Sequence, residues 1–341
     1  MAREKEPQIP RGTKNVCIFD TNAYRVLTFG KPLTEARTIA RELRHLEQSA
    51  GTIALANPFV IWELIGHLDD AGDPAYHHCL NALVALSEHT WRRQDPPGGV
   101  CLVSDAESTV CGTLFEALPL VAYKNVQNLA LLAAHMKQNA PNVTNSAAVN
   151  NLKVFASEMK KKQERWLEDM QLVLNGCDPK LAQAWAGGTS DKEVRKRLTA
   201  YFGSKEFMNA WATVGVMSHA DLVGAKPTPS EIEKKVDVMR NVFPVPFHLI
   251  SALLQKFPTS PEMNLNSRKR KRENFMWDAA ICYSIGGFHQ IGGAAMFLVT
   301  DDAAIRDAAA AAKCTDRVVS LADYLKSLGF GRPNSGPSAN G

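Results

Sequence analysis

Two short apolar runs, each followed directly by acidic residues, lie near opposite ends of the 341-residue chain. Asp20 follows the run Val16–Phe19, and the polar segment Thr300–Asp302 follows the run Ala294–Val299. Short unbroken apolar runs are typical of strands that are buried on both faces of a parallel sheet. Thr52–Ala56 has the same character, and segments with helical spacing follow each of these runs. The pattern predicts one parallel α/β sheet to which both ends of the chain contribute.

Apolar residues at three- and four-residue spacing predict the helices that connect these strands. A helix is expected at Leu33–Ala50, and another begins at Pro58, since proline suits the first turn of a helix. The same spacing continues from residue 71 to residue 272, where strand alternation is scarce, so we predict a large all-helical insertion there. Two of its helix starts, Ser190–Glu193 and Thr228–Glu231, have the sequence of a capping box. Further helices are expected at Glu273–Ile285, Ala303–Ala312 and Leu321–Leu328.

A chain of this length forms about two domains or one domain with a large insertion, and the order of the predicted elements favours the second arrangement. We predict an N-terminal tail at 1–14, a split core at 15–70 and 273–330, a helical insertion at 71–272 and a C-terminal tail at 331–341. The C-terminal tail is rich in Gly, Pro, Ser and Asn, so we expect it to be disordered.

Composition and charge exclude several classes of protein. With 45% hydrophobic and 22% charged residues, the chain has the balance of a globular protein and not of a disordered polar chain. Its seven cysteines are widely spaced and include no C-x-x-C pair, so we expect reduced thiols and a cytoplasmic location. The first 14 residues lack the apolar segment of a secretory signal, and glycines interrupt the apolar stretch Ile285–Val299, so we expect no membrane segment. The net charge of +4 is too small to identify a nucleic-acid partner by itself.

Four acids are placed where a parallel sheet would bring them together. Asp20 and Asp302 follow apolar runs, and ligand crevices form at the carboxyl ends of parallel strands. Glu63 and Asp278 lie inside apolar segments, where a carboxylate is costly to bury unless it is paired or holds a metal. Converging carboxylates repel one another unless a cation neutralises them, and an all-oxygen ligand set favours Mg²⁺ or Mn²⁺.

Each acid also has a simpler interpretation. Asp20, and either Asp301 or Asp302, could cap the helix that follows it. Glu63 could face solvent, and Asp278 could compensate the dipole at the start of its helix. The joint arrangement of the acids favours a shared site over these separate roles.

The order of four motifs resembles that of the PIN-domain ribonucleases. The motifs are Ile18–Asn22, Pro58–Leu64, Asp278–Ile281 and Leu298–Asp302, and Arg317–Leu325 is similar to the family's final strand and helix. This resemblance implies a three-layer α/β/α parallel sheet of the PIN type, interrupted here by the helical insertion. It also implies a cluster of acids that binds Mg²⁺ or Mn²⁺.

The resemblance assigns roles to individual residues. It implies that Asp20, Glu63, Asp278 and Asp302 are catalytic and, with Asp301, bind the metal, while Asn22 and Thr300 support the cluster. The implied activity is the hydrolysis of phosphodiester bonds in RNA by a metal-activated water, leaving a 5′-phosphate and a 3′-hydroxyl.

A basic run lies shortly before Asp278 in the sequence. Five consecutive cations could hold an RNA backbone without reading its bases; they are Arg268, Lys269, Arg270, Lys271 and Arg272. The run could instead be a solvated loop or a nuclear-import-like signal. A second basic stretch, Lys192–Arg197, could extend the surface or form an exposed helix face. The insertion could also bind a second copy of the chain or an inhibitory protein.

Two other functions are compatible with the acids. A phosphatase of the haloacid-dehalogenase type also begins with a strand that ends in aspartate, but it needs a second aspartate where this chain has Asn22. The chain could also be an RNA-binding or interaction protein with a non-catalytic PIN-like domain.

Overall fold

The computed structural model describes residues 9–68, 70–91, 100–119, 129, 133, 135, 138, 146–187, 189–256, 258, 274–286, 290–291 and 293–330. Three predicted features fall wholly or largely outside these residues. They are most of the N-terminal tail, the C-terminal tail at 331–341 and the basic run Arg268–Arg272.

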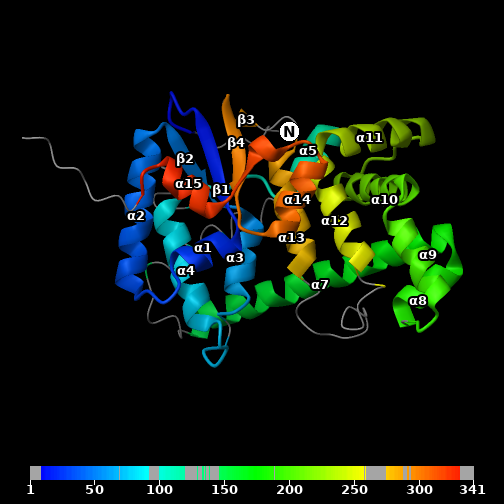
Figure 1. The fold of residues 1–341 in the computed structure, drawn as a ribbon, viewed down its shortest axis with the longest axis horizontal. Coiled ribbons are helices and arrows are strands. Elements are labelled where there is room, and N and C mark those ends of the chain that lie inside the picture. Colours follow the sequence, from blue (N-terminus) through cyan, green and yellow to red (C-terminus); the bar gives the residue numbers. More distant parts are fainter. Residues whose placement is uncertain are drawn as a thin grey trace, which may run out of the picture.

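A five-stranded sheet contains the predicted strands. Four strands run parallel in the order β2 (Thr52–Leu55), β1 (Asn15–Phe19), β4 (Ala294–Val299) and β5 (Val318–Val319). A short strand that the sequence did not predict, β3 (Gln290–Ile291), pairs antiparallel with the start of β4. The predicted α/β class is confirmed, and strands from both ends of the chain lie side by side at the centre of the sheet (Figure 1).

The register between β1 and β4 aligns their carboxyl ends. Asn15 pairs with Ala295 and Phe19 with Val299, so the two strands end level with each other. The backbone N–H of Asp20 then donates to the carbonyl oxygen of Val299 at 3.1 Å. The residues that follow both strands therefore emerge at one edge of the sheet.

Helices cover both sides of the sheet (Figure 1). On one side lie α1 (Thr21–Leu27), α2 (Leu33–Ser49), α4 (Tyr76–His89) and α15 (Leu321–Ser327). Tyr324 of α15 packs edge-on against Phe19 of β1, with ring centroids 5.5 Å apart. On the other side lie α12 (Pro244–Lys256), α13 (Asn274–Cys282) and α14 (Ala303–Ala311). The helix α3 (Pro58–Ile65) follows β2, as predicted.

The helix predicted at Glu273–Ile285 is divided in the structure. It is α-helical in α13 and continues as a 3₁₀ turn at Tyr283–Ile285. Gly286 then passes very close to the start of α12, because a Cβ at this position would lie 2.6 Å from Cδ1 of Phe243 and 2.7 Å from the carbonyl oxygen of Val242. Only glycine fits this approach without a shift of the neighbouring chain.

The described residues between 105 and 256 are largely helical. Their helices are α5 (Ala106–Phe115), α7 (Ser146–Cys177), α8 (Pro179–Gly187), α9 (Lys192–Phe202), α10 (Lys205–Val223) and α11 (Pro229–Val242). The capping box predicted at Thr228 is confirmed, with reciprocal hydrogen bonds between Thr228 and Glu231. The one predicted at Ser190 is wrong, because Asp191 caps α9 through its own carboxylate. A carboxylate can bond directly to the first free amides of a helix, as the serine was expected to do.

Residues beyond 70 also pack beside the sheet. Arg41 of α2 and Glu88 of α4 form an ion pair at 3.1 Å. The N–H of Ala56 donates to the carbonyl of Cys101 at 3.0 Å, which extends the edge next to β2. The buried apolar residues form one cluster that includes Ile18 of the sheet and Phe202 of α9. The domain division stays a prediction, and the helices of residues 71–256 share a core with the sheet.

Candidate active site

Asp20 is buried at the junction between β1 and α1. It caps α1 by accepting a hydrogen bond at Oδ1 from the N–H of Ala23 at 2.5 Å. Its Oδ2 accepts a hydrogen bond from the hydroxyl of Thr300, which is fully buried. The predicted capping role of Asp20 is therefore present, and a residue from the end of β4 holds the second carboxylate oxygen.

Thr300 connects Asp20 to Asp302. The hydroxyl oxygen of Thr300 accepts a hydrogen bond from the N–H of Asp302 at 3.0 Å. Asp302 caps α14, because its Oδ1 accepts from the N–H of Ile305 at 2.9 Å. One threonine thus sets the positions of two acids on neighbouring strand ends, which agrees with the supporting role that the resemblance implies for Thr300.

Glu63 lies on α3 and is held by a residue that the sequence analysis did not single out. Its Oε2 accepts a hydrogen bond from the hydroxyl of Thr21 at 2.6 Å. Asn57 caps α3 and donates from Nδ2 to Ser284 at 2.8 Å, which fixes the start of the helix against the turn after α13. The place of Thr21 directly after Asp20 is the signal that could have identified it.

Aromatic residues pack the helix that carries Asp278 against the helix that carries Glu63. Trp277 precedes Asp278 on α13 and packs against Phe59 of α3 at 5.6 Å and against Trp62 at 6.1 Å between ring centroids. These contacts join α13, which carries Asp278, to α3, which carries Glu63. The apolar residues that precede Asp278 and surround Glu63 in the sequence therefore include the contact between α13 and α3.

Burial and the charges of neighbouring acids shift the pKa values of this group. Burial raises the pKa of Asp20 to about 7, opposed by its hydrogen bonds and supported by the nearby charges of Glu63 and Asp302. Burial is the main cause that raises the pKa of Asp278 to about 8, and the charges of Asp302, Glu63 and Asp20 contribute to the same rise. Burial also raises the pKa of Glu63, whereas Thr21, Arg25 and His67 lower it. The structure thus brings together Asp20, Glu63, Asp278 and Asp302.

These acids are the residues that could hold a metal ion. Carboxylate and hydroxyl oxygens are ligands that suit Mg²⁺ and Mn²⁺. In the described part of the chain, the three-residue group whose ligand atoms all lie within 4.8 Å of one another is elsewhere, at Cys17, Glu47 and His89. A cation among the four acids would therefore draw the carboxylates closer or keep several of its waters, as Mg²⁺ commonly does.

Two of the expected site residues lie apart from this group. Asp301 is exposed, and its Oδ1 accepts a hydrogen bond from the N–H of Leu321 at 3.0 Å, at the start of α15. Asn22 is also exposed. The metal role of Asp301 and the supporting role of Asn22 stay predictions. The side chain that holds Glu63 is the hydroxyl of Thr21.

The second basic stretch forms one wall of an open groove. Lys192, Arg195 and Lys196 of α9 line this groove together with Gln255 of α12. Arg195 is oriented by a hydrogen bond from its Nε to the carbonyl of Thr189 at 2.7 Å. Arg197 is different because it forms an ion pair with Asp178. The groove combines several positive charges with an amide side chain, which is suitable for contact with an anionic polymer.

A scan of family models, a search of curated proteins and a search of solved structures each found no match to this chain. In the part of the chain that the structure describes, no helix has the length and apolar character needed to cross a membrane.

Proposed function

We propose that this protein is a metal-dependent ribonuclease. The observation that carries the proposal is the set of hydrogen bonds at the ends of β1 and β4, in which Thr300 links Asp20 to Asp302 and Thr21, next to Asp20, holds Glu63. The charges of these three acids also raise the pKa of Asp278. Asp20 is buried and Asp278 partly buried, and ionising both acids together is costly because the pKa of each is raised. Such a pair favours a divalent cation as a partner.

The chain's own residues would hold and orient this centre. The hydroxyl of Thr300 fixes Asp20 relative to Asp302, and the hydroxyl of Thr21 fixes Glu63. When bound, Mg²⁺ or Mn²⁺ lowers the pKa of a coordinated water and stabilises the oxygens of an in-line displacement at phosphorus. The four carboxylates supply the negative charge that retains the cation, and no protein nucleophile is needed.

The basic groove supports RNA as the substrate class. Lys192 and Lys196 of α9 are exposed, and α9 packs on α12, which also packs on α13 and α14. The helix α12 therefore packs both against α9, which lines the groove, and against α13 and α14, the helices associated with Asp278 and Asp302. Phosphate contacts at such a surface position a nucleic acid and make its binding depend on salt.

The proposal is tested by incubating the protein with end-labelled single-stranded and structured RNA in Mn²⁺, in Mg²⁺ or in EDTA. Asp20→Asn and Glu63→Gln should each reduce metal-dependent cleavage by more than about 100-fold, since each removes a charge from the metal centre. Asp307→Asn is the matched control, because Asp307 is an exposed acid on α14 outside the group.

The outcomes distinguish three functions. Cleavage that depends on metal and is lost in both variants supports the proposal, whereas cleavage that both variants retain contradicts the assigned site. Release of phosphate from a small phosphomonoester, with a phosphoryl group trapped on Asp20, identifies a phosphatase. RNA binding without cleavage under every condition identifies a non-catalytic RNA-binding protein.

A further inference from the structure

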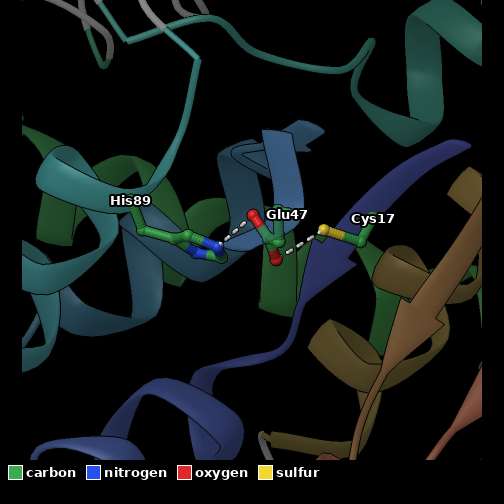
Figure 2. A group of neighbouring side chains, drawn as sticks. All are labelled: Cys17, Glu47 and His89. Atoms are coloured by element: carbon green, nitrogen blue, oxygen red, sulfur yellow. Dashed lines mark hydrogen bonds and ion pairs between the residues drawn. The ribbon is translucent and has the colours of Figure 1, made fainter. Parts of the chain in front are cut away.

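Cys17, Glu47 and His89 form a second group of interacting polar side chains, buried between β1, α2 and α4 (Figure 2). The thiol of Cys17 donates to Oε1 of Glu47 at 3.3 Å, and Nε2 of His89 lies 2.7 Å from Oε2 of the same carboxylate. All three residues have 0% exposure. They come from three different elements, β1, α2 and α4, so their approach is a product of the tertiary fold.

Two tyrosines surround this group. The hydroxyl of Tyr24 lies 3.0 Å from Nδ1 of His89, and the hydroxyl of Tyr324 donates to Oε1 of Glu47 at 2.7 Å. Tyr324 also lies 3.4 Å from the sulfur of Cys17. Metal ligands in proteins are commonly oriented by such contacts. A histidine ligand forms a hydrogen bond through the ring nitrogen that does not bind the metal, and a carboxylate ligand accepts one.

The net charge of the group depends on which of its members carry a proton. The ion-pair partner of Glu47 is His89, and a neutral His89 leaves one negative charge in a fully buried setting. With Cys17 as thiolate, Glu47 as carboxylate and His89 neutral, the group carries two negative charges. A divalent cation would neutralise these charges completely.

We propose that Cys17, Glu47 and His89 bind a structural zinc ion, with the hydroxyl of Tyr324 completing the coordination. Thiolate, imidazole and carboxylate are the ligands that zinc takes in proteins, and a sulfur ligand disfavours Mg²⁺ and Ca²⁺. Binding releases the thiol proton of Cys17, and Nδ1–H of His89 then donates to the oxygen of Tyr24. The ion would join β1, α2 and α4 behind the strand that ends at Asp20.

This inference does not rest on the ribonuclease proposal, because the two groups share no residue. It is tested on the full chain purified without chelators from medium that contains zinc. Elemental analysis should find one zinc per chain, and X-ray absorption should find one sulfur ligand among nitrogen and oxygen ligands. Replacement by Co²⁺ should produce the charge-transfer band of a cobalt–thiolate bond.

Variants locate the ion. Cys17→Ser should remove the cobalt–thiolate band, and Tyr324→Phe should weaken zinc binding by about 10-fold. Cys111→Ser is the matched control, since Cys111 is another buried cysteine, on α5, and should retain both the zinc and the band. Asp20→Asn should also retain the zinc.

Two results would overturn the inference. One is a folded wild-type chain that, after exposure to zinc and to cobalt, contains no zinc and shows no cobalt–thiolate band. This result would identify the group as a hydrogen-bonded network. The other is zinc that persists in Cys17→Ser and is lost in Asp20→Asn, which would place the ion among the four acids. Because metal content and X-ray absorption are measured on the wild-type chain, the test holds even if a variant does not fold.

Discussion

The hydroxyl of Thr300 donates a hydrogen bond to Oδ2 of Asp20, although 280 positions of the chain separate these residues. The pairing of β1 with β4 places the two strand ends level, and the hydrogen bond follows from that register. The positions of Asp20 and Asp302 are therefore fixed by the centre of the sheet.

Replacing Thr300 with valine should weaken metal binding. Thr300→Val keeps the branched shape and removes the hydroxyl, so Asp20 loses a contact that favours its charged form and its pKa should rise above about 7. We expect Mn²⁺ affinity at neutral pH to fall by about 10-fold, as for the loss of one hydrogen bond to a charged group. Titration calorimetry measures this, with Thr300→Ser as the control. Equal affinity in Thr300→Val and wild type would contradict the role of the hydroxyl.

Without metal, the stability of the protein should fall as the pH rises. Asp20 and Asp278 have pKa values of about 7 and about 8 in the folded state, raised from the ordinary aspartate value of 3.8. Between about pH 4 and about pH 8 the folded state therefore binds more protons than the unfolded state, so its free energy of unfolding decreases with pH. The contribution should amount to a few kcal/mol.

Thermal unfolding in EDTA across this pH range measures the effect. The double variant Asp20→Asn/Asp278→Asn should lose most of the slope, and added Mn²⁺ should restore stability to the wild type at the alkaline end. A slope that is unchanged in the double variant would show that other groups control it.

The hydroxyl of Tyr324 should contribute to stability beyond the packing of its ring. Tyr324→Phe keeps the ring contacts with Phe19 and Phe297 and removes the donor to Glu47. Loss of a hydrogen bond to a buried carboxylate should cost about 1–3 kcal/mol. Chemical denaturation measures the change, and Tyr76→Phe is a control at a buried tyrosine outside this network. An unchanged midpoint in Tyr324→Phe would show that Glu47 does not depend on this donor.

Two glycines should respond in opposite ways to alanine. Gly286→Ala would place a methyl group against Phe243 and the backbone of Val242, and such overpacking should destabilise the protein by about 1–3 kcal/mol. Gly112→Ala meets no atom within 4 Å and lies inside α5, so it should stabilise the protein by about 0.5–1 kcal/mol. Thermal unfolding of both variants tests this. Similar melting temperatures for the two would contradict the close approach at Gly286.

The sequence predicted much of the sheet and of the acid group. The strands at residues 15–19, 52–55 and 294–299 are short apolar runs that composition alone identifies. The first two are buried along nearly their whole length, whereas Ala295 of the third is exposed. Asp20 and Asp302 were predicted from their places after two of these runs. The antiparallel strand β3 was not predicted, because two residues carry no recognisable alternation.

The buried partners of Cys17 were also missed, and the reason is chemical. Glu47 lies on the same face of α2 as Ala36, Ala40 and Leu43, which are all buried. The spacing alone would place Glu47 in the core, but a carboxylate at the end of an apolar stripe is normally assigned to solvent. Its partners His89 and Tyr324 come from distant parts of the chain, so only the fold reveals why its burial is tolerated.

The adjacency of β1 and β4 also sets an order of events during synthesis. A ribosome releases β1 long before β4 exists, so one edge of the first strand stays unpaired while the intervening helices are made. Pairing between such distant segments is slow because a long loop must close first. The acids can assemble only after residue 302 has been added, so a translation product interrupted earlier carries Asp20 and Glu63 without the partners that complete the group.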